Sequence, residues 1–124
     1  MLKLQRVNLE SYREYCLSKK GAEETFPFGE SVLVFKVEGK MFALSGVEDF
    51  ERISLKVKPE EGVELRDSYP AVREAYHLNK KHWITVMMDG TVSDKLVRQW
   101  IDRSYELVVD GLPKKVRDKV RSGK

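Results

Sequence analysis

A tight hairpin near the middle of the chain constrains the fold more than any other feature. Two runs of strand-forming residues, Val32–Val37 and Lys40–Ser45, are separated only by Glu38 and Gly39. A two-residue connection joins antiparallel strands, because a parallel pair needs a much longer crossover. The sequence therefore predicts an antiparallel pair at this point.

Further runs extend this pair into a sheet. Arg52–Val57 alternates apolar and polar residues with a period of two, so its apolar residues point to one face while Ser54 and Lys56 point to the other. Val72–Tyr76 is expected as a short edge strand, and His82–Met88 as a longer one. We therefore expect an antiparallel sheet with one solvent-facing side.

Three segments carry apolar residues at helical spacing and are predicted to form helices. They cover residues 9–17 after the potential cap Asn8, residues 59–65 with proline first, and residues 96–108 after the potential cap Ser93. The basic tail 113–124 is expected to form a last short helix. These elements predict a single α+β domain over residues 1–124, in which a twisted antiparallel sheet packs in two layers against N- and C-terminal helices.

The composition fits one soluble domain. With 41% hydrophobic and 35% charged residues, the 124-residue chain can bury a core without staples. The lone Cys16 excludes an internal disulfide, is typical of a reducing compartment, and is expected to be buried on a helix. No apolar run approaches the roughly 20 residues that span a bilayer, so a soluble cytoplasmic protein without membrane contact is predicted.

An aromatic and basic segment, residues 76–86, leads into the last predicted strand. Its Lys80 and Lys81 could contact successive phosphates of a nucleic acid, and the amide of Asn79 could contact a base edge or a phosphate. The other side chains of this segment that could contact nucleic acid are Tyr76, His77, His82 and Trp83. The alternative is a solvated turn, since paired lysines are common in surface loops.

The aromatic residues of this segment have two interpretations. Tyr76 and Trp83 could stack on unpaired bases if their rings are exposed. Trp83 alternates with Thr85 along the predicted strand, which favours a position in the core. For Tyr76 the two interpretations are equally open. Trp100 belongs to a helical stripe of apolar residues and is expected in the core.

Basic residues elsewhere could extend the surface. The net charge of +3 is mild, so the position of the charges matters more than their total. Lys36 and Lys40 flank the predicted hairpin turn, and the tail 113–124 carries six basic residues against one acid. The first basic residues of the tail are Lys114, Lys115 and Arg117.

An aromatic corner, Phe26, Pro27, Phe28 and Gly29, precedes the hairpin. Proline fixes one backbone angle and glycine frees another, so a turn displays the two rings. If the rings are exposed, the corner is a candidate protein-interaction patch. A second function therefore stays open, a protein-interaction module that does not bind nucleic acid.

The sequence contains no motif typical of a catalytic or metal-binding site. The serines lie in no nucleophile-elbow motif, and there is no glycine-rich phosphate loop. His77 and His82 are five positions apart, and the acids near them in sequence do not complete a metal site. We therefore expect no catalytic residue, no metal and no cofactor.

Four blocks of the chain occur together in one known family. They are Phe26 to Gly29, the Lys40–Leu44 strand, Tyr76–Thr85 and Ile101–Val108. In this order they resemble the MmcQ/YjbR family of small bacterial proteins, over most of residues 26–113. The resemblance implies an α+β fold similar to that of the bacterial frataxin CyaY, and a role in binding DNA through a pair of β wings.

The residues and the resemblance together predict a non-enzymatic protein that binds DNA weakly, as a monomer or weak dimer. Contacts to phosphate would dominate, and specificity would be low because the basic segment has no arginine to read guanine. The predicted contact residues are Lys36, Lys40, Tyr76, His77, Asn79, Lys80, Lys81, His82, Lys114, Lys115 and Arg117.

Overall fold

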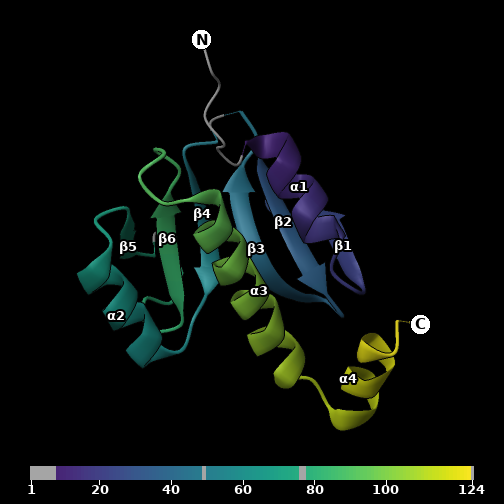
Figure 1. Ribbon diagram of the computed structural model, residues 1–124. Helices are drawn as coiled ribbons and strands as arrows, with labels where there is room; N and C mark the ends of the chain where they lie inside the picture. Colours follow the sequence, from purple (N-terminus) through teal and green to yellow (C-terminus); the bar gives the residue numbers. More distant parts are fainter. Residues whose placement is uncertain (1–7, 49, 76–77, 124) are drawn as a thin grey trace.

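The computed structural model describes residues 8–48, 50–75 and 78–123 of the chain. Within these residues, six strands form one antiparallel sheet in the order β1-β2-β3-β4-β6-β5. The strands are β1 (Ala22–Thr25), β2 (Val32–Val37), β3 (Lys40–Gly46), β4 (Arg52–Lys56), β5 (Val72–Glu74) and β6 (Trp83–Met87). The helices are α1 (Leu9–Leu17), α2 (Pro59–Ser68), α3 (Asp94–Asp110) and α4 (Lys114–Arg121) (Figure 1).

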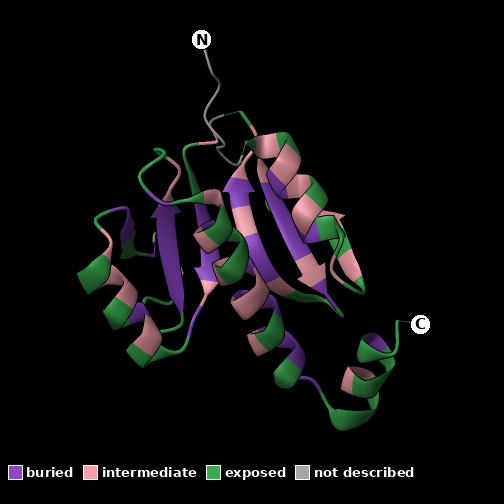
Figure 2. Cartoon of the chain, in the orientation of Figure 1, coloured by how far each residue is buried: buried purple, intermediate pink, exposed green. Residues whose placement is uncertain are grey.

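Helices α1 and α3 cover one face of the sheet, and α3 lies across β3 and β4 (Figure 1). Buried residues are concentrated in the strands and on the helix surfaces that face them (Figure 2). Helix α2 packs beside the β5 end of the sheet, and α4 follows α3 at the C-terminal end. The two-layer α+β fold predicted from the sequence is therefore confirmed.

The helix starts are set by the expected local signals. Asn8 Oδ1 accepts a hydrogen bond from the Ser11 backbone N–H at 2.8 Å, and Ser11 Oγ accepts one from the Asn8 N–H at 3.0 Å. Ser93 Oγ accepts from the Leu96 N–H at 3.2 Å, and Pro59 opens α2. Each cap satisfies a backbone donor that the first helical turn leaves unpaired.

Strand β1 is an element that the sequence pattern does not predict, because Glu23 and Glu24 are poor strand formers. The strand forms at the sheet edge, where Thr25 Oγ1 donates to the Val34 carbonyl at 2.9 Å. Glu24 also accepts two hydrogen bonds from Arg13 of α1, at 2.5 and 2.8 Å, and these bonds lower the pKa of the Glu24 carboxyl. These side-chain bonds supplement the backbone pairing of the acidic edge strand β1 with β2.

A β-bulge interrupts the pairing of β2 with β3. Phe35 pairs with Ala43, whereas the next residue, Lys36, pairs with Met41. Phe42 is therefore the extra residue in β3. Because of this extra residue, Phe42 and Ala43 both join the core although they are adjacent in sequence.

Ser104 of α3 bridges β3 and β4 beyond the bulge. The ladder between these strands ends at the pair Ala43 and Leu55. The Ser104 hydroxyl, which is fully buried, donates to the Phe42 carbonyl at 2.6 Å and accepts from the Lys56 N–H at 2.8 Å. One helix side chain therefore satisfies two backbone groups where the strands separate.

The β2–β3 turn requires a left-handed backbone at two positions. Glu38 has φ of 50° and Gly39 has φ of 77°, the combination found in type I′ turns. Glycine adopts this conformation without strain, whereas glutamate does so at a cost.

Replacing Glu38 with asparagine is expected to raise the free energy of unfolding by about 0.5–1 kcal/mol, because asparagine tolerates the left-handed region better than glutamate. Urea denaturation measures the change. Glu38→Gln is the control, since it removes the same charge without that backbone preference. An equal gain in Glu38→Gln would attribute the effect to charge and contradict the conformational explanation.

A chain of aromatic rings links the helices to the sheet through the core. Tyr12 of α1 lies 5.6 Å from Phe35 of β2, between ring centroids, and Phe35 lies 6.3 Å from Phe42 of β3. Phe42 in turn lies 5.3 Å from Tyr105 of α3, in an edge-to-face arrangement. Such pairs add to the stabilisation that burial alone provides.

Three further side chains test the predicted core. Cys16 is 0% exposed in the core, as expected, and burial raises the pKa of its thiol. Trp83 is buried as expected, at 8% exposed, but its pairing with Lys56 places it on the sheet face opposite α1 and α3. Trp100 is only partly buried, which corrects the prediction of a core position. Its ring meets Tyr69 edge-on at 5.1 Å, at the margin where α3 faces α2 rather than the sheet.

Candidate nucleic-acid interface

The face of the sheet opposite α1 and α3, called the open face below, lacks a layer of described helices (Figure 1). Val34 points to this face, because its neighbour Phe35 points into the core and side chains alternate along a strand. The residues paired with Val34 from strand to strand point to the same face and form one row across the described sheet. The row consists of Thr25, Val34, Leu44, Ser54, Thr85 and Arg73. Val34, Ser54 and Thr85 in this row are buried, whereas Arg73 is exposed.

Basic residues outnumber acids on the open face. Alternation and register place Lys36, Arg52, Lys56 and Arg73 there. In the described strands the acid on the same face is Glu23, which lies opposite Lys36 on β1. The strand residues of the open face therefore carry a positive excess, although Asp89 lies close enough to Arg73 to interact with it, and Glu48 and Glu51 line a hollow together with Arg52.

The two predicted wings lie at the same end of the sheet. Strands β2 and β5 are related by four successive antiparallel pairings, so they run in the same direction and end on the same side. The β2–β3 turn and the loop from β5 to β6 therefore flank the end of β4. The two lysines of the first hairpin diverge, because Lys40 pairs with the core residue Val37 and so points away from the face that carries Lys36.

Residues 79–82 form a tight turn before β6. The His82 N–H donates to the Asn79 carbonyl at 3.2 Å, and Asn79 Oδ1 accepts from the Lys81 N–H at 2.8 Å. The His82 carbonyl accepts from the Val57 N–H at 2.9 Å, which anchors the turn to the end of β4. The side-chain oxygen of Asn79 thus organises the turn itself.

The basic side chains of this turn are exposed, but they have different partners. Lys80 Nζ donates to the Ala75 carbonyl at 3.2 Å, which holds the chain back toward β5. Lys81 has no such bond to any described residue. Tyr76 and His77, which the sequence also assigns to this surface, lie outside the described residues.

The open face is hollowed between the aromatic corner and the loop before β6. The hollow has a volume of about 410 Å³, with Phe28 and Leu78 among its lining residues. The other lining residues include Val32, Leu44, Arg52 and Ser54. The apolar residue Leu78 lines the hollow, so the loop before β6 folds back over this part of the open face.

The aromatic corner displays its two rings as expected. Phe26 is 48% exposed and Phe28 is 61% exposed. The Gly29 N–H donates to the Phe26 carbonyl at 3.2 Å, and Gly29 has φ of 105°, a conformation that suits glycine. A hydrogen-bonded turn therefore holds the rings at the surface.

Helix α4 lies on the side of the sheet that α1 and α3 cover. Its Val120 lies beside Gly21 and the core residue Val37, at the end of β2. The structure therefore separates the predicted tail contacts from the basic side chains of the open face. These tail contacts are Lys114, Lys115 and Arg117.

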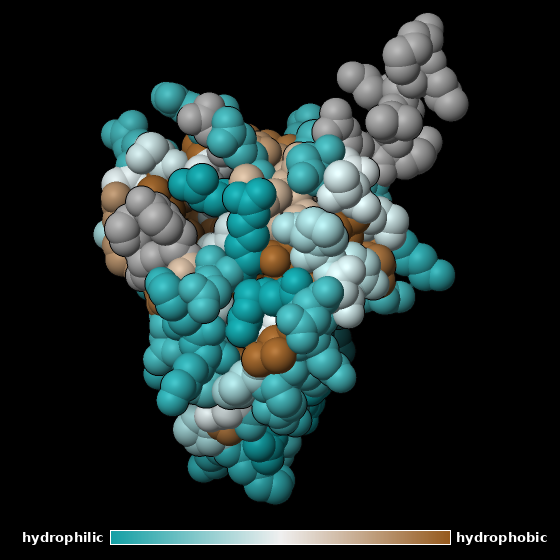
Figure 3. Space-filling view, turned by 90° about the vertical axis from the view of Figure 1, so that its left-hand side faces the viewer, coloured by the Kyte–Doolittle hydropathy of each residue, from teal (hydrophilic) through white to brown (hydrophobic). Residues whose placement is uncertain are grey.

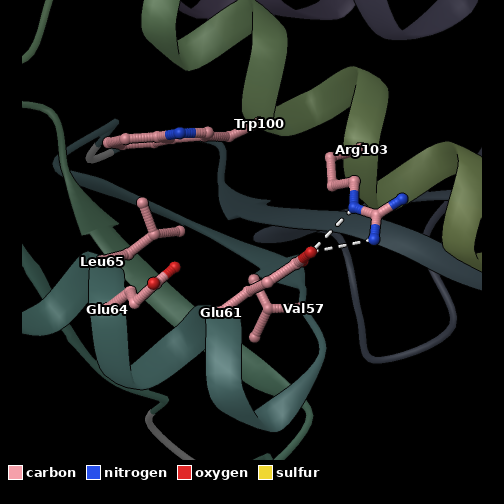
Figure 4. A pocket seen from close by; sticks show the side chains of 6 residues that line it. All are labelled: Val57, Glu61, Glu64, Leu65, Trp100 and Arg103. Atoms are coloured by element: carbon pink, nitrogen blue, oxygen red, sulfur yellow. Dashed lines mark hydrogen bonds and ion pairs between the residues drawn. The ribbon is translucent and has the colours of Figure 1, made fainter.

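A smaller hollow of about 220 Å³ lies between α2 and α3, where the Trp100 ring stands over Leu65 (Figure 4). Arg103 and Glu61 close one side through an ion pair of 2.9 Å, and hydrogen bonds from Arg103 lower the pKa of the Glu61 carboxyl. Seen from the side of α2 and β5, the surface is mainly hydrophilic with separate apolar areas (Figure 3). This view shows no continuous apolar patch of the size that marks a large interface.

Arg52, Lys56 and Arg73 belong to the open face but are missing from the predicted contacts. The alternation in β4 already places Lys56 on the solvent-facing side. Arg73 has no such signal, because its place depends on the pairing of the short strand β5 with β6.

Two other kinds of site have no support in the described part of the chain. No group of three or more histidine, cysteine or acidic side chains is placed there to hold a metal ion. None of the described helices is long and apolar enough to cross a membrane.

Comparison with known proteins identifies relatives along almost the whole chain. The chain is 38% identical to the YbdF protein of Escherichia coli O157:H7, over 92% of this chain and 94% of the relative. It is also 38% identical to the YjbR protein of Escherichia coli K12, over 90% of this chain and 95% of the relative.

The solved structures agree. The crystal structure of the Deinococcus radiodurans protein DR2400 matches with a TM-score of 0.87 and 40% identity, covering 96% of this chain and 91% of that one. A Pseudomonas syringae crystal structure matches with a TM-score of 0.69 and 29% identity, covering 82% of this chain and 98% of that one. The family model YjbR matches residues 17–107. The chain therefore belongs to the YjbR family, as its four sequence blocks indicate.

Proposed function

We propose that this protein is a non-enzymatic DNA-binding protein that contacts the phosphate backbone with its open face. The observation that carries the proposal is the charge of that face, where the strand residues Lys36, Lys56 and Arg73 outnumber Glu23. Lys80 and Lys81 add two exposed cations at the end where the strands β2 and β5 finish. Lysine and arginine side chains that neutralise phosphates release counterions, which favours binding at low salt.

The proposed binding has low sequence specificity. Contacts to phosphate fix the position of a protein on the nucleic acid but do not read bases. The open face is a sheet surface, and none of the described helices projects from it toward a groove (Figure 1). Affinity should therefore depend more on salt than on sequence.

A protein-interaction module is the second candidate, and the exposure of Phe26 and Phe28 favours it. Exposed rings on a hydrogen-bonded turn are suited to anchor a partner protein. The two candidates differ in their response to salt, because apolar contacts are not weakened as salt rises in the way phosphate contacts are.

The test is a fluorescence-anisotropy titration of labelled DNA at about 50 and 200 mM salt. Replacing Lys36 and Lys81 with glutamine is expected to weaken binding and to reduce the slope of log K against log salt by about 1.4–1.8, as two phosphate contacts are lost. The matched control replaces Lys114 and Lys115, which lie on α4, with glutamine. It removes the same charge and should change the slope by much less.

Two outcomes would count against the proposal. If wild-type protein binds no DNA at the lower salt concentration, the protein-interaction module becomes the better candidate. If both double variants weaken binding equally, net charge rather than the open face explains the attraction. Circular dichroism spectra of all variants should match wild type, since the four lysines are intermediate or exposed.

A further inference from the structure

The hollow on the open face has the size and lining of a small-ligand site. Its volume of about 410 Å³ lies within the range of roughly 300–1,000 Å³ typical of ligand pockets. Phe28, Leu44 and Leu78 supply apolar surface, and Ser54 and Arg52 supply polar atoms. This combination of apolar walls with a few polar groups is typical of sites that fix the orientation of a bound ring.

The surroundings of the hollow select the kind of ligand. An inorganic phosphate would gain nothing from walls formed by Phe28, Leu44 and Leu78. An uncharged apolar ligand would gain nothing from Lys36 and Lys56, which lie outside the hollow, two residues beyond Val34 and Ser54 on the same face. A ligand that uses both features has a flat ring joined to phosphate, which describes the nucleotides of a single strand.

We propose that the hollow receives an unpaired nucleobase, so that the protein binds single-stranded DNA in preference to duplex DNA. This inference rests on the proposed DNA-binding function and specifies its substrate. In a duplex the bases are stacked and paired, and extruding one costs free energy before it can enter a pocket. In a single strand the bases are already accessible, and the basic residues of the open face bind the flanking phosphates.

Phe28 is the stacking residue in this arrangement. It is 61% exposed at the rim of the hollow, and the adjacent turn is closed by the hydrogen bond from the Gly29 N–H to the Phe26 carbonyl. Because the turn is already formed, the ring is held at the rim before the base arrives. Phe26 belongs to the same turn but is not among the lining residues, which makes it a matched control.

The experiment compares three labelled probes by fluorescence anisotropy at low salt. They are a DNA strand of about 12 nucleotides, its duplex, and a strand of equal length in which abasic residues replace the bases. We expect wild-type protein to bind the single strand at least about tenfold more tightly than the duplex or the abasic strand. Phe28→Ala should weaken single-strand binding by about 5- to 100-fold and leave duplex binding unchanged, whereas Phe26→Ala should change either by less than about twofold.

The outcomes separate this inference from the proposed function. Equal binding of single strand and duplex, with no effect of Phe28→Ala, would overturn the base-binding hollow and leave the DNA-binding proposal intact. Equal losses in Phe28→Ala and Phe26→Ala would also overturn it, because only Phe28 lines the hollow. If the abasic strand binds as tightly as the normal strand, the base-binding hollow is also overturned. Failure of all three probes to bind would overturn both proposals.

Discussion

Replacing Phe42 with alanine is expected to lower the free energy of unfolding by about 3–5 kcal/mol. Phe42 is fully buried, and its ring lies between those of Phe35 and Tyr105 at centroid distances of 6.3 and 5.3 Å. Truncation removes the contacts that join β3 to α3. A closely packed core collapses only in part around such a cavity, so most of its cost is retained.

Thermal and urea denaturation, followed by circular dichroism, measure this loss, and Tm should fall by roughly 10–25 °C. Phe26→Ala is the matched control, because it removes the same side chain from a residue that is 48% exposed. Its free energy of unfolding should change by less than about 0.5 kcal/mol. Similar losses in the two variants would show that the aromatic chain in the core is not the cause.

Replacing Ser104 with alanine is expected to lower the free energy of unfolding by about 2–4 kcal/mol. The substitution removes few atoms, so the cost comes from hydrogen bonding rather than from a cavity. Without the hydroxyl, the Phe42 carbonyl loses a buried partner at 2.6 Å, and the Lys56 N–H loses a partly buried one at 2.8 Å. Water cannot easily replace them there, so each group carries its desolvation penalty.

Urea denaturation of Ser104→Ala, compared with that of Thr85→Val, isolates the effect of the hydrogen bonds on the free energy of unfolding. Thr85 is also a buried hydroxyl residue of the sheet, but its Oγ1 has no hydrogen-bond partner among the described residues. Its replacement by the isosteric valine should therefore be neutral or stabilising by up to about 1 kcal/mol. A comparable destabilisation of both variants would mean that the bridge between β3 and β4 contributes little.

The elements that sequence predicts well are those defined by local chemistry. The β2–β3 hairpin follows from two strand-forming runs around Glu38 and Gly39, and its turn needs no distant residue. The helix starts follow from Asn8, Pro59 and Ser93, each of which satisfies or avoids an unpaired backbone donor. These signals act within a few residues, so a single sequence reveals them.

The features that sequence misses depend on residues far apart in the chain. Strand β1 pairs with β2 and is tied to α1 by the two bonds from Arg13 to Glu24, and glutamate gives no strand signal. Trp100 fits a core stripe by spacing, yet α3 turns that ring toward α2. The charge of the open face emerges only when the register aligns Lys36, Lys56 and Arg73 on one side.

The place of β4 in the sheet has a consequence for the order in which the protein assembles. Strands β2, β3 and β4 follow one another in sequence and in the sheet, whereas β6 reaches β4 only after α2 and β5. Closing that longer loop costs more chain entropy, so we expect the meander to form early and the β5–β6 hairpin to dock late. A nascent chain that ends before Trp83 therefore carries only part of the open face. Detachment of this one hairpin would remove Arg73 and Leu78 from the open face while the meander stays folded.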